Sequence, residues 1–228
     1  MDLSYEIIVQ GNNLKLRDGF LGLSNVTLVR APSGPILVDT GGYVTRLTLL
    51  NALKARDLTP ADIPLVFLSH LHFDHSHNID LFPDAKILVS RAEWDYVANP
   101  HRDDLFVPWG IREQLERHDL DLIDGEGQIE PGLEFFPAPG HTPGCFALKL
   151  SVPDKGLVVI AADAIKYPKE ALQGACDLEF DPMNRGGDTI RRILAMADRI
   201  VPGHFPELRR TAKGLTWDTE VEFSLLIR

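Results

Sequence analysis

The sequence has few cysteines and lacks long apolar runs. Cys145 and Cys176 are the two cysteines in 228 residues, and no Cys-x-x-Cys pair occurs, so the sequence suggests no sulfur-based zinc site. No apolar stretch approaches the roughly 20 residues that a membrane-spanning helix needs. The amino terminus has no positively charged stretch followed by an apolar one, as a secretory signal would have. We therefore expect a cytoplasmic protein with no membrane span, in which a disulfide is unsupported.

Basic residues are also scarce. The net charge is −10 at pH 7, and no run is rich in Lys and Arg. Because a protein that follows a phosphate backbone normally presents a basic face, the charge argues against a nucleic-acid partner. The shares of hydrophobic residues, 44%, and charged residues, 25%, are typical of a globular protein. The length suits one large core, so we expect a single domain over residues 1–228.

Apolar runs bounded by turn residues predict a chain of both strands and helices. Strands are expected where short apolar or alternating runs occur, and helices where apolar residues recur every three or four positions. The expected strands are residues 5–10, 25–30, 34–39, 65–68, 86–90, 120–123, 133–136, 146–152, 157–161 and 200–201. The expected helices are residues 44–56, 78–82, 91–98, 111–118 and 187–199, and the tail, 215–228, is expected to add a final helix or strand.

A cluster of four histidines and one aspartate, residues 70–77, directly follows one of these apolar runs. His70 and His72 are two positions apart, so on extended backbone their side chains point the same way. Asp74 and His75 follow where the chain must turn, and they can reach a second point nearby. Neutral imidazole and carboxylate are the ligands that borderline divalent ions such as zinc prefer. The cluster therefore predicts two adjacent metal ions rather than structural histidines.

Other expected strand ends carry further candidate ligands. His141 lies in a turn framed by proline and glycine, and His204 follows the run 200–201. Asp163 ends another apolar strand, and its two oxygens could join two cations. A turn histidine without a metal is the alternative for His141. Three histidines lie outside any ligand pattern, namely His77, His101 and His118.

The spacing His-x-His-x-Asp-His resembles the signature of the metallo-β-lactamase superfamily. The runs Gly-His-Thr-Pro-Gly around His141 and Pro-Gly-His ending at His204 are similar to its later motifs. The resemblance covers residues 26–205 and implies an α+β fold, an αββα sandwich of two mixed β-sheets flanked by helices. The runs 34–42, 81–84 and 201–204 look most like the small single-domain hydrolase branch of metallo-β-lactamase domain-containing protein 1, which is glyoxalase II-like.

The resemblance also implies a ligand set for two divalent ions in each chain, with zinc expected and iron or manganese as alternatives. The set is His70, His72 and His141 for the first ion, Asp74, His75 and His204 for the second, and Asp163 as the bridge. Asp39, at the end of an expected strand, would orient a metal-bound histidine. The alternative for Asp39, together with Thr40, is a plain helix N-cap.

The reaction expected from such a centre is hydrolysis. Two neighbouring cations can share a water and lower its pKa to about 7, which generates a hydroxide nucleophile. The catalytic residues would be Asp74, which could orient this water, and the bridging Asp163. The expected substrate is a small ester, thioester or lactone. Alternatives are a mononuclear iron persulfide dioxygenase-like enzyme, a phosphodiesterase or nuclease of the same superfamily, and a non-catalytic metal-stabilised binding protein. A homodimer is an open alternative to a single chain.

Four residues are candidate substrate contacts: Phe20, Trp109, Lys166 and Tyr167. The first two lie in the loops 17–25 and 100–110, which also contain Phe106, and such loops often cover pockets. The last two follow the bridging aspartate closely and could bind a substrate carboxylate or polarise a carbonyl. The alternatives are an aromatic side chain packed on the domain and a solvent-facing lysine–tyrosine pair.

Overall fold

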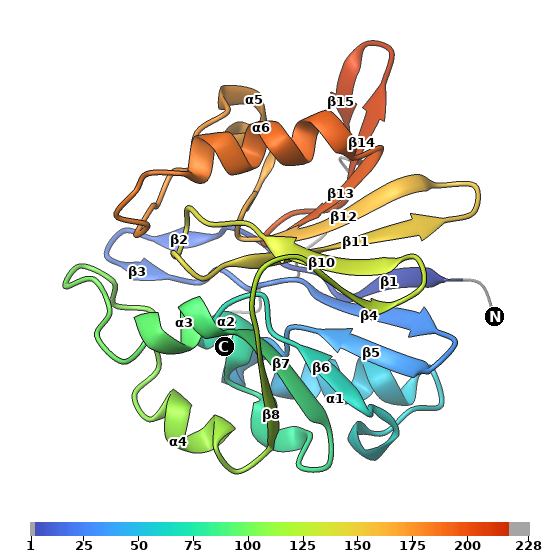
Figure 1. Cartoon of the computed structure of the whole chain (residues 1–228), viewed down its shortest axis with the longest axis vertical. Helices are drawn as coiled ribbons and strands as arrows, with labels where there is room; N and C mark the ends of the chain where they lie inside the picture. Colours follow the sequence, from blue (N-terminus) through green and yellow to red (C-terminus); the bar gives the residue numbers. More distant parts are fainter. Residues whose placement is uncertain (1–2, 219–228) are drawn as a thin grey trace.

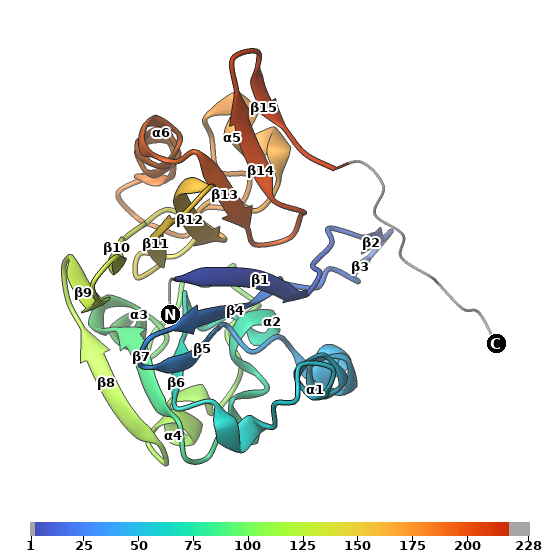
Figure 2. The ribbon, with the colours of Figure 1, turned by 90° about the vertical axis from the view of Figure 1, so that its right-hand side faces the viewer.

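The structure is a computed structural model that describes residues 3–218, and its centre is formed by two β-sheets that lie face to face (Figures 1 and 2). The first sheet has the order β1 (Ser4–Val9), β4 (Val26–Ala31), β5 (Gly34–Val38), β6 (Leu65–Phe67), β7 (Lys86–Ser90) and β8 (Asp119–Ile123). The second has the order β15 (Gly214–Thr216), β14 (Leu208–Thr211), β13 (Arg199–Pro202), β12 (Gly156–Ala162), β11 (Phe146–Val152), β10 (Leu133–Pro137) and β9 (Gly127–Glu130). A separate hairpin consists of β2 (Lys15–Leu16) and β3 (Gly19–Phe20).

Both sheets are mixed. In the first, β1, β4 and β5 pair antiparallel, whereas β5, β6, β7 and β8 pair parallel. In the second, β12 and β13 pair parallel and the other neighbours pair antiparallel. Parallel neighbours end at the same edge of a sheet, so loops that follow them in the chain lie close together.

Helices cover the outer faces of the sandwich (Figure 1). Those on the side of the first sheet are α1 (Arg46–Lys54), α2 (Phe73–Ser76), α3 (Arg91–Tyr96) and α4 (Ile111–Leu115), with the 3-10 turns η1 (Tyr43–Thr45), η2 (Pro60–Asp62) and η3 (Ile79–Leu81). Those on the side of the second sheet are α5 (Pro168–Gln173) and α6 (Gly186–Met196). The predicted α+β sandwich of two mixed sheets flanked by helices is confirmed.

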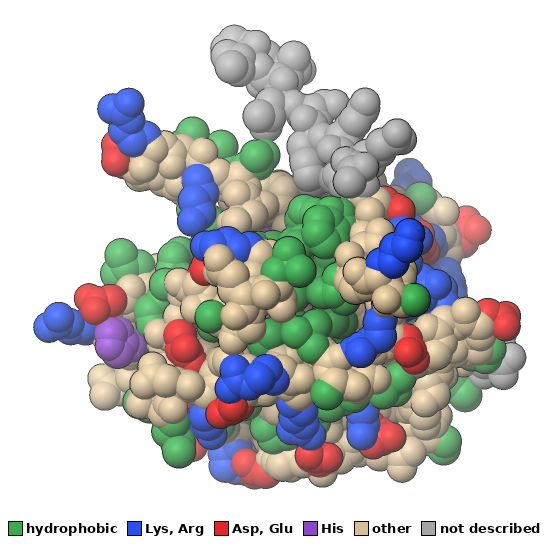
Figure 3. All heavy atoms as spheres, turned by 90° about the horizontal axis from the view of Figure 1, so that it is seen from above, with side chains coloured by type: hydrophobic (Ala, Val, Ile, Leu, Met, Phe, Trp, Pro, Cys, Tyr) green, Lys and Arg blue, Asp and Glu red, His purple; other side chains and the backbone are tan. Residues whose placement is uncertain are grey.

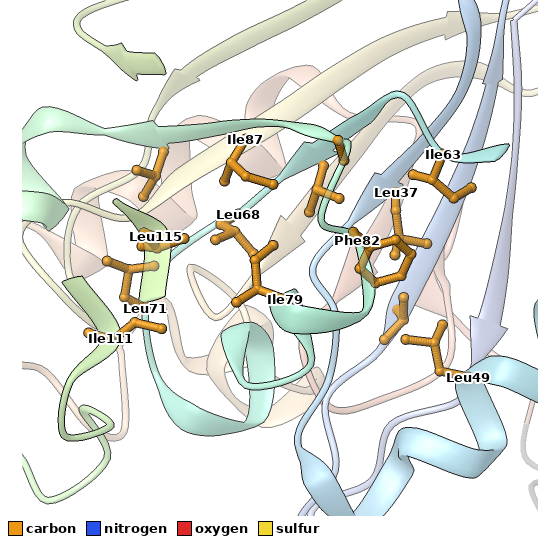
Figure 4. Close-up of a cluster of buried hydrophobic side chains, with 14 of the residues drawn as sticks. Leu37, Leu49, Ile63, Leu68, Leu71, Ile79, Phe82, Ile87, Ile111 and Leu115 are labelled. Carbon is orange, nitrogen blue, oxygen red and sulfur yellow. The ribbon is translucent and has the colours of Figure 1, made fainter. Parts of the chain in front are cut away.

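Alternation along the strands explains why the sheets stack. On β4 and β5, Leu28 and Leu37 point outward and belong to one buried cluster with Leu49 and Leu53 of α1. Figure 4 shows part of this cluster, with Leu37 and Leu49 labelled. Their neighbours point inward and form the interior between the two sheets, together with apolar residues of β11 and β12. A third cluster lies between the second sheet and α6. A sheet that is apolar on both faces must be covered on both, which gives the four layers.

Several predicted elements differ from the structure. The helix expected over 78–82 is the single turn η3, and the one expected over 111–118 ends at Leu115. The strands β9 and β14 were not predicted, because they are short and carry charged or polar residues without an apolar alternation. The tail expected from residue 215 contributes the end of β15, and residues 219–228 lie outside the described part.

In Figure 3, blue and red side chains are interspersed around a hydrophobic area, so this face has no continuous basic track. Within residues 3–218, no helix has the length and apolar character that crossing a bilayer requires.

Candidate metal centre

The seven proposed ligands all follow strands of the two central sheets. His70 and His72 come directly after β6, and α2 places Asp74 and His75 one turn further on. From the second sheet, one ligand follows each of β10, β12 and β13: His141, Asp163 and His204. All seven are buried, from 0% exposed for His70 to 6% for Asp74. The structure thus brings residues more than 130 positions apart to one edge of the sandwich.

The first triplet consists of His70, His72 and His141. One ring nitrogen of each lies within 4.8 Å of the others. Nε2 of His141 and Nδ1 of His72 lie 2.9 Å apart. Three imidazole nitrogens that converge in this way could hold one divalent cation.

The second triplet consists of Asp74, His75 and His204, whose ligand atoms also lie within 4.8 Å of one another. Nε2 of His204 is 3.4 Å from Oδ2 of Asp74, and Nε2 of His75 is 3.9 Å from the same oxygen. This triplet could hold a second cation, with one carboxylate in place of an imidazole.

Asp163 lies between the two triplets. Its Oδ2 is 3.2 Å from Nε2 of His141, in the first triplet. Its Oδ1 is 3.1 Å from Nε2 of His75 and 3.3 Å from Nε2 of His204, both in the second. One oxygen therefore faces each triplet, as a carboxylate that joins two cations requires.

Two local features give this carboxylate its place. Ala162, the residue before it, has a φ of 44°, a left-handed conformation that side chains rarely adopt. A Cβ on Gly203 would lie 2.0 Å from Oδ1 of Asp163, so only a glycine leaves room there. The strained backbone at Ala162 and the missing side chain at Gly203 together let the carboxylate point toward the histidines.

Within residues 3–218, three buried atoms at the centre make no hydrogen bond: Nε2 of His70, Nε2 of His75 and Oδ1 of Asp163. The last two lie 3.1 Å apart but are not aligned as donor and acceptor. A buried polar atom without a partner costs about 1–3 kcal/mol, so such atoms are rare in a native structure. All three belong to the ligand set and have lone pairs that a cation would use. The donor set of imidazoles and carboxylates therefore fits divalent ions.

The other ring nitrogen of every ligand histidine faces a protein oxygen. These contacts fix the orientation of each ring and leave the opposite nitrogen free for a metal. They join His70 to Ser69 Oγ at 3.0 Å, His72 to Asp104 Oδ2 at 2.9 Å, His75 to Asp39 Oδ2 at 2.8 Å, His141 to the Leu178 carbonyl at 2.8 Å and His204 to the Leu23 carbonyl at 3.0 Å.

Electrostatics at the centre differs between the ligand histidines. Burial lowers the pKa of His70 and His141 well below the usual histidine range, and neighbouring cationic groups lower it further, so both rings are neutral. Although burial lowers the pKa of His75 and His204, the facing carboxylates of Asp163 and Asp74 raise it above the usual histidine range, so a cation would displace protons from these two rings. Burial alone would raise the pKa of the Asp163 carboxyl. The histidines that face it nevertheless hold that pKa well below its usual range, so the carboxylate is ionised.

A cavity of about 490 Å³ opens onto the centre. Five of the proposed ligands form part of its lining, namely His72, Asp74, His141, Asp163 and His204. Phe20, Phe106 and Leu178 contribute apolar wall, and Lys15 and Lys169 contribute charged groups. The centre is buried but accessible to a small molecule through this cavity.

The family model described as "Metallo-beta-lactamase superfamily" matches residues 19–204. The chain belongs to the metallo-beta-lactamase superfamily. It is 34% identical over 204 residues to human metallo-beta-lactamase domain-containing protein 1, an alignment that covers 87% of this chain and 68% of that protein. It is also 29% identical over 215 residues to an N-acyl homoserine lactonase of Bacillus thuringiensis, with 82% of each chain covered. The protein is a metallo-hydrolase of this superfamily.

Solved structures of the superfamily share the fold. An N-acyl homoserine lactone hydrolase, with the product N-hexanoyl-L-homoserine at its catalytic metal centre, superposes with a TM-score of 0.71 at 22% identity and covers 90% of this chain and 93% of its own. A dizinc quorum-quenching lactonase superposes with a TM-score of 0.67 at 23% identity and covers 91% and 83%. At these identities the likeness concerns the fold alone.

Three of the four candidate substrate contacts line the cavity, and Trp109 does not. Trp109 is 98% exposed and lies in surface hollows beside α4. The same loop instead directs Phe106 inward, where its carbonyl accepts a hydrogen bond from the Phe73 amide at 2.9 Å and its ring contacts Phe20. An irregular loop has no side-chain period, so the sequence could not show which aromatic residue turns inward.

Lys166 and Tyr167 both line the cavity, but each already has an acidic partner. Lys166 is 7% exposed, so the solvent-facing alternative is wrong for this residue. Its Nζ lies 2.6 Å from Glu170, and although burial lowers the lysine pKa, this carboxylate raises it overall. The hydroxyl of Tyr167 donates to Asp177 at the cavity wall.

Two buried acids at the centre have different sequence signals. Asp39, which was expected to orient a metal-bound histidine, accepts from His75 and from the Ser69 amide and hydroxyl, each at 2.8 Å. It has a φ of 61° and lies outside the cap of the following turn, which begins after Gly42. Asp104 was not predicted, because an acid in an irregular loop has no local signal. Its contact with His72 depends on where the loop folds.

Proposed function

We propose that the protein is a dinuclear metal-dependent hydrolase of small esters, thioesters or lactones. The observation that carries the proposal is the position of Asp163, with one oxygen toward each ligand triplet. Two divalent cations, for which zinc is the expected identity, would supply hydroxide from water at neutral pH and stabilise negative charge on the carbonyl oxygen under attack. The proposal treats residues 1–228 as one domain, since ligands from both sheets form one centre.

The residues around this centre would hold and orient the reactants. Asp74 lines the cavity, so its carboxylate can accept a hydrogen bond from the attacking water and hold its proton. Hydrolysis of an ester or lactone produces a carboxylate. We propose that Lys166, which lines the same cavity and forms an ion pair with Glu170, also contacts that product group.

The cavity favours a small substrate with an apolar arm. Its volume, about 490 Å³, suits a small molecule. Phe20 and Phe106 would contact the apolar arm and exclude water from the reacting carbonyl. Because N-acyl homoserine lactonases are among the relatives, an acylated lactone is the first substrate to test.

The test combines elemental analysis with a substrate screen on the whole chain. We expect about two metal ions per chain and metal-dependent hydrolysis of lactones or esters in a panel that also contains thioesters, β-lactams and phosphodiesters. His72→Ala should abolish hydrolysis, because it removes a ligand from the first triplet. A single iron with oxygen consumption would instead indicate a dioxygenase. Absence of any metal-dependent rate across the panel would leave a binding protein.

A further inference from the structure

A buried carboxylate outside the ligand set connects the two halves of the centre. Glu93, on α3, is 0% exposed and belongs neither to the proposed ligands nor to the lining of the cavity. Within residues 3–218, no lysine, arginine or histidine forms an ion pair with it. A carboxylate buried without a cation is costly unless hydrogen bonds satisfy both of its oxygens.

Both oxygens of Glu93 accept hydrogen bonds from segments that carry ligands. Oε1 accepts from the backbone N–H of Leu71 at 2.9 Å, and Leu71 lies between His70 and His72. Oε2 accepts from the hydroxyl of Thr142 at 2.6 Å, and Thr142 directly follows His141. One carboxylate therefore contacts the two segments that supply the whole first triplet, one from each sheet.

The same turn of α3 makes further contacts with the segment after His141. The hydroxyl of Ser90 donates to the carbonyl of Gly144 at 2.6 Å and accepts from the Glu93 amide at 2.9 Å. A Cβ on Gly144 would lie 2.1 Å from the Glu93 amide nitrogen, so the two backbones are in direct contact there. The backbone of Glu93 is thus fixed by Ser90 and Gly144, while its side-chain oxygens bond the two ligand segments.

We propose that Glu93 is a positioning residue that sets the distance between His70 and His72 on one sheet and His141 on the other. The inference rests on the proposed first triplet. Without the hydrogen bonds to Glu93, the N–H of Leu71 has no acceptor, and the segment after β10 loses the bond from Thr142 that connects it to the first-sheet side. The three imidazoles would then converge less well, and the affinity for the first ion would fall.

The test compares Glu93→Ala with Glu93→Gln in the full-length chain. The readouts are zinc affinity, by competition with a chelator, and the visible spectrum of the cobalt(II)-loaded protein, which reports the ligand geometry. Glu93→Ala should weaken zinc binding by about 10- to 100-fold and alter the cobalt spectrum. Glu93→Gln should stay within a few-fold, because its amide can accept from Leu71 and donate to Thr142. The Thr142 hydroxyl can then turn to Sγ of Cys145, 3.0 Å away.

Leu53→Ala on α1 is the matched control. It also removes a fully buried side chain, but one in the cluster between α1 and the first sheet. It should destabilise the protein while leaving zinc affinity and the cobalt spectrum unchanged. An affinity of Glu93→Ala equal to that of Leu53→Ala would overturn the proposal. So would an equal loss in Glu93→Gln and Glu93→Ala.

A second pair of variants covers the case in which Glu93→Ala does not fold. Thr142→Val removes one of the two bonds and should weaken zinc binding, whereas Thr142→Ser keeps the hydroxyl and should restore it. Equal affinities in these two would contradict the proposal. All of these readouts are independent of turnover. A wild-type protein that binds two ions and hydrolyses nothing would overturn the proposed function and leave the role of Glu93 intact.

Discussion

The two ligand triplets differ in charge and in the way their histidines are held. The first contains three imidazoles, whereas the second contains the carboxylate of Asp74. In each triplet, a buried aspartate outside the ligand set accepts a hydrogen bond from one histidine: Asp104 accepts from His72, and Asp39 accepts from His75. Asp104 comes from an irregular loop and Asp39 from the end of a central strand. The first triplet thus depends more on loop structure, and the second on the sheet itself.

The largest expected effect comes from the residue that the triplets share. In Asp163→Asn, one oxygen is replaced by an amide nitrogen that donates hydrogen bonds and cannot bind a cation. Hydrolysis should fall to background, and elemental analysis should find fewer than two ions. Gly203→Ala is a second way to the same result, since its methyl group would displace Oδ1. Full activity with two bound ions in either variant would contradict the shared role.

The next variants separate the triplets from each other. Asp104→Ala should loosen His72 and weaken the first ion, and Asp39→Ala should loosen His75 and weaken the second. Each should cost about 10- to 100-fold in affinity for its own ion. Sequential loading with cobalt(II) distinguishes the two sites by their spectra. If both variants weakened the same ion, the assignment of the aspartates to separate triplets would be wrong.

The smallest effects are expected at the cavity wall, which touches both triplets. The ring of Phe20 contacts His204, with centroids 6.2 Å apart, and the ring of Phe106 contacts His72, with centroids 5.5 Å apart. Phe20→Ala should raise KM for an acylated lactone several-fold and change kcat less, since it removes contact with the apolar arm. Trp109→Ala is the control and should leave both constants unchanged, because Trp109 lies outside the cavity. A larger KM change in Trp109→Ala would place the substrate elsewhere.

The sequence predicted the parts of this centre that have a local pattern. A strand such as β6 is an apolar run, and the polar residues that follow it must lie at the sheet edge, so the positions of His70 and His72 could be predicted. The position of Asp163 could be predicted for the same reason. These arguments need only neighbouring residues and the rule that functional sites in α/β folds lie at the carboxyl ends of strands.

Unlike Asp39, the supporting acids Asp104 and Glu93 had no such pattern. Asp104 lies in a loop, and Glu93 occupies an ordinary position in the first turn of a helix. What makes each important is a contact made across the fold, with His72 in one case and with Leu71 and Thr142 in the other. Only tertiary structure determines such contacts, because they join residues far apart in the chain.

The order of the ligands along the chain has a consequence for protein synthesis. Four of the seven proposed ligands lie before residue 76, and the other three lie after residue 140. A nascent chain therefore exposes the histidine cluster well before the bridging carboxylate and the last histidine exist. An ion captured early would have fewer ligands and would exchange readily. Stable metal binding would then require the ligands that follow residue 140. Chains truncated before them could be distinguished from longer chains by their lack of bound metal.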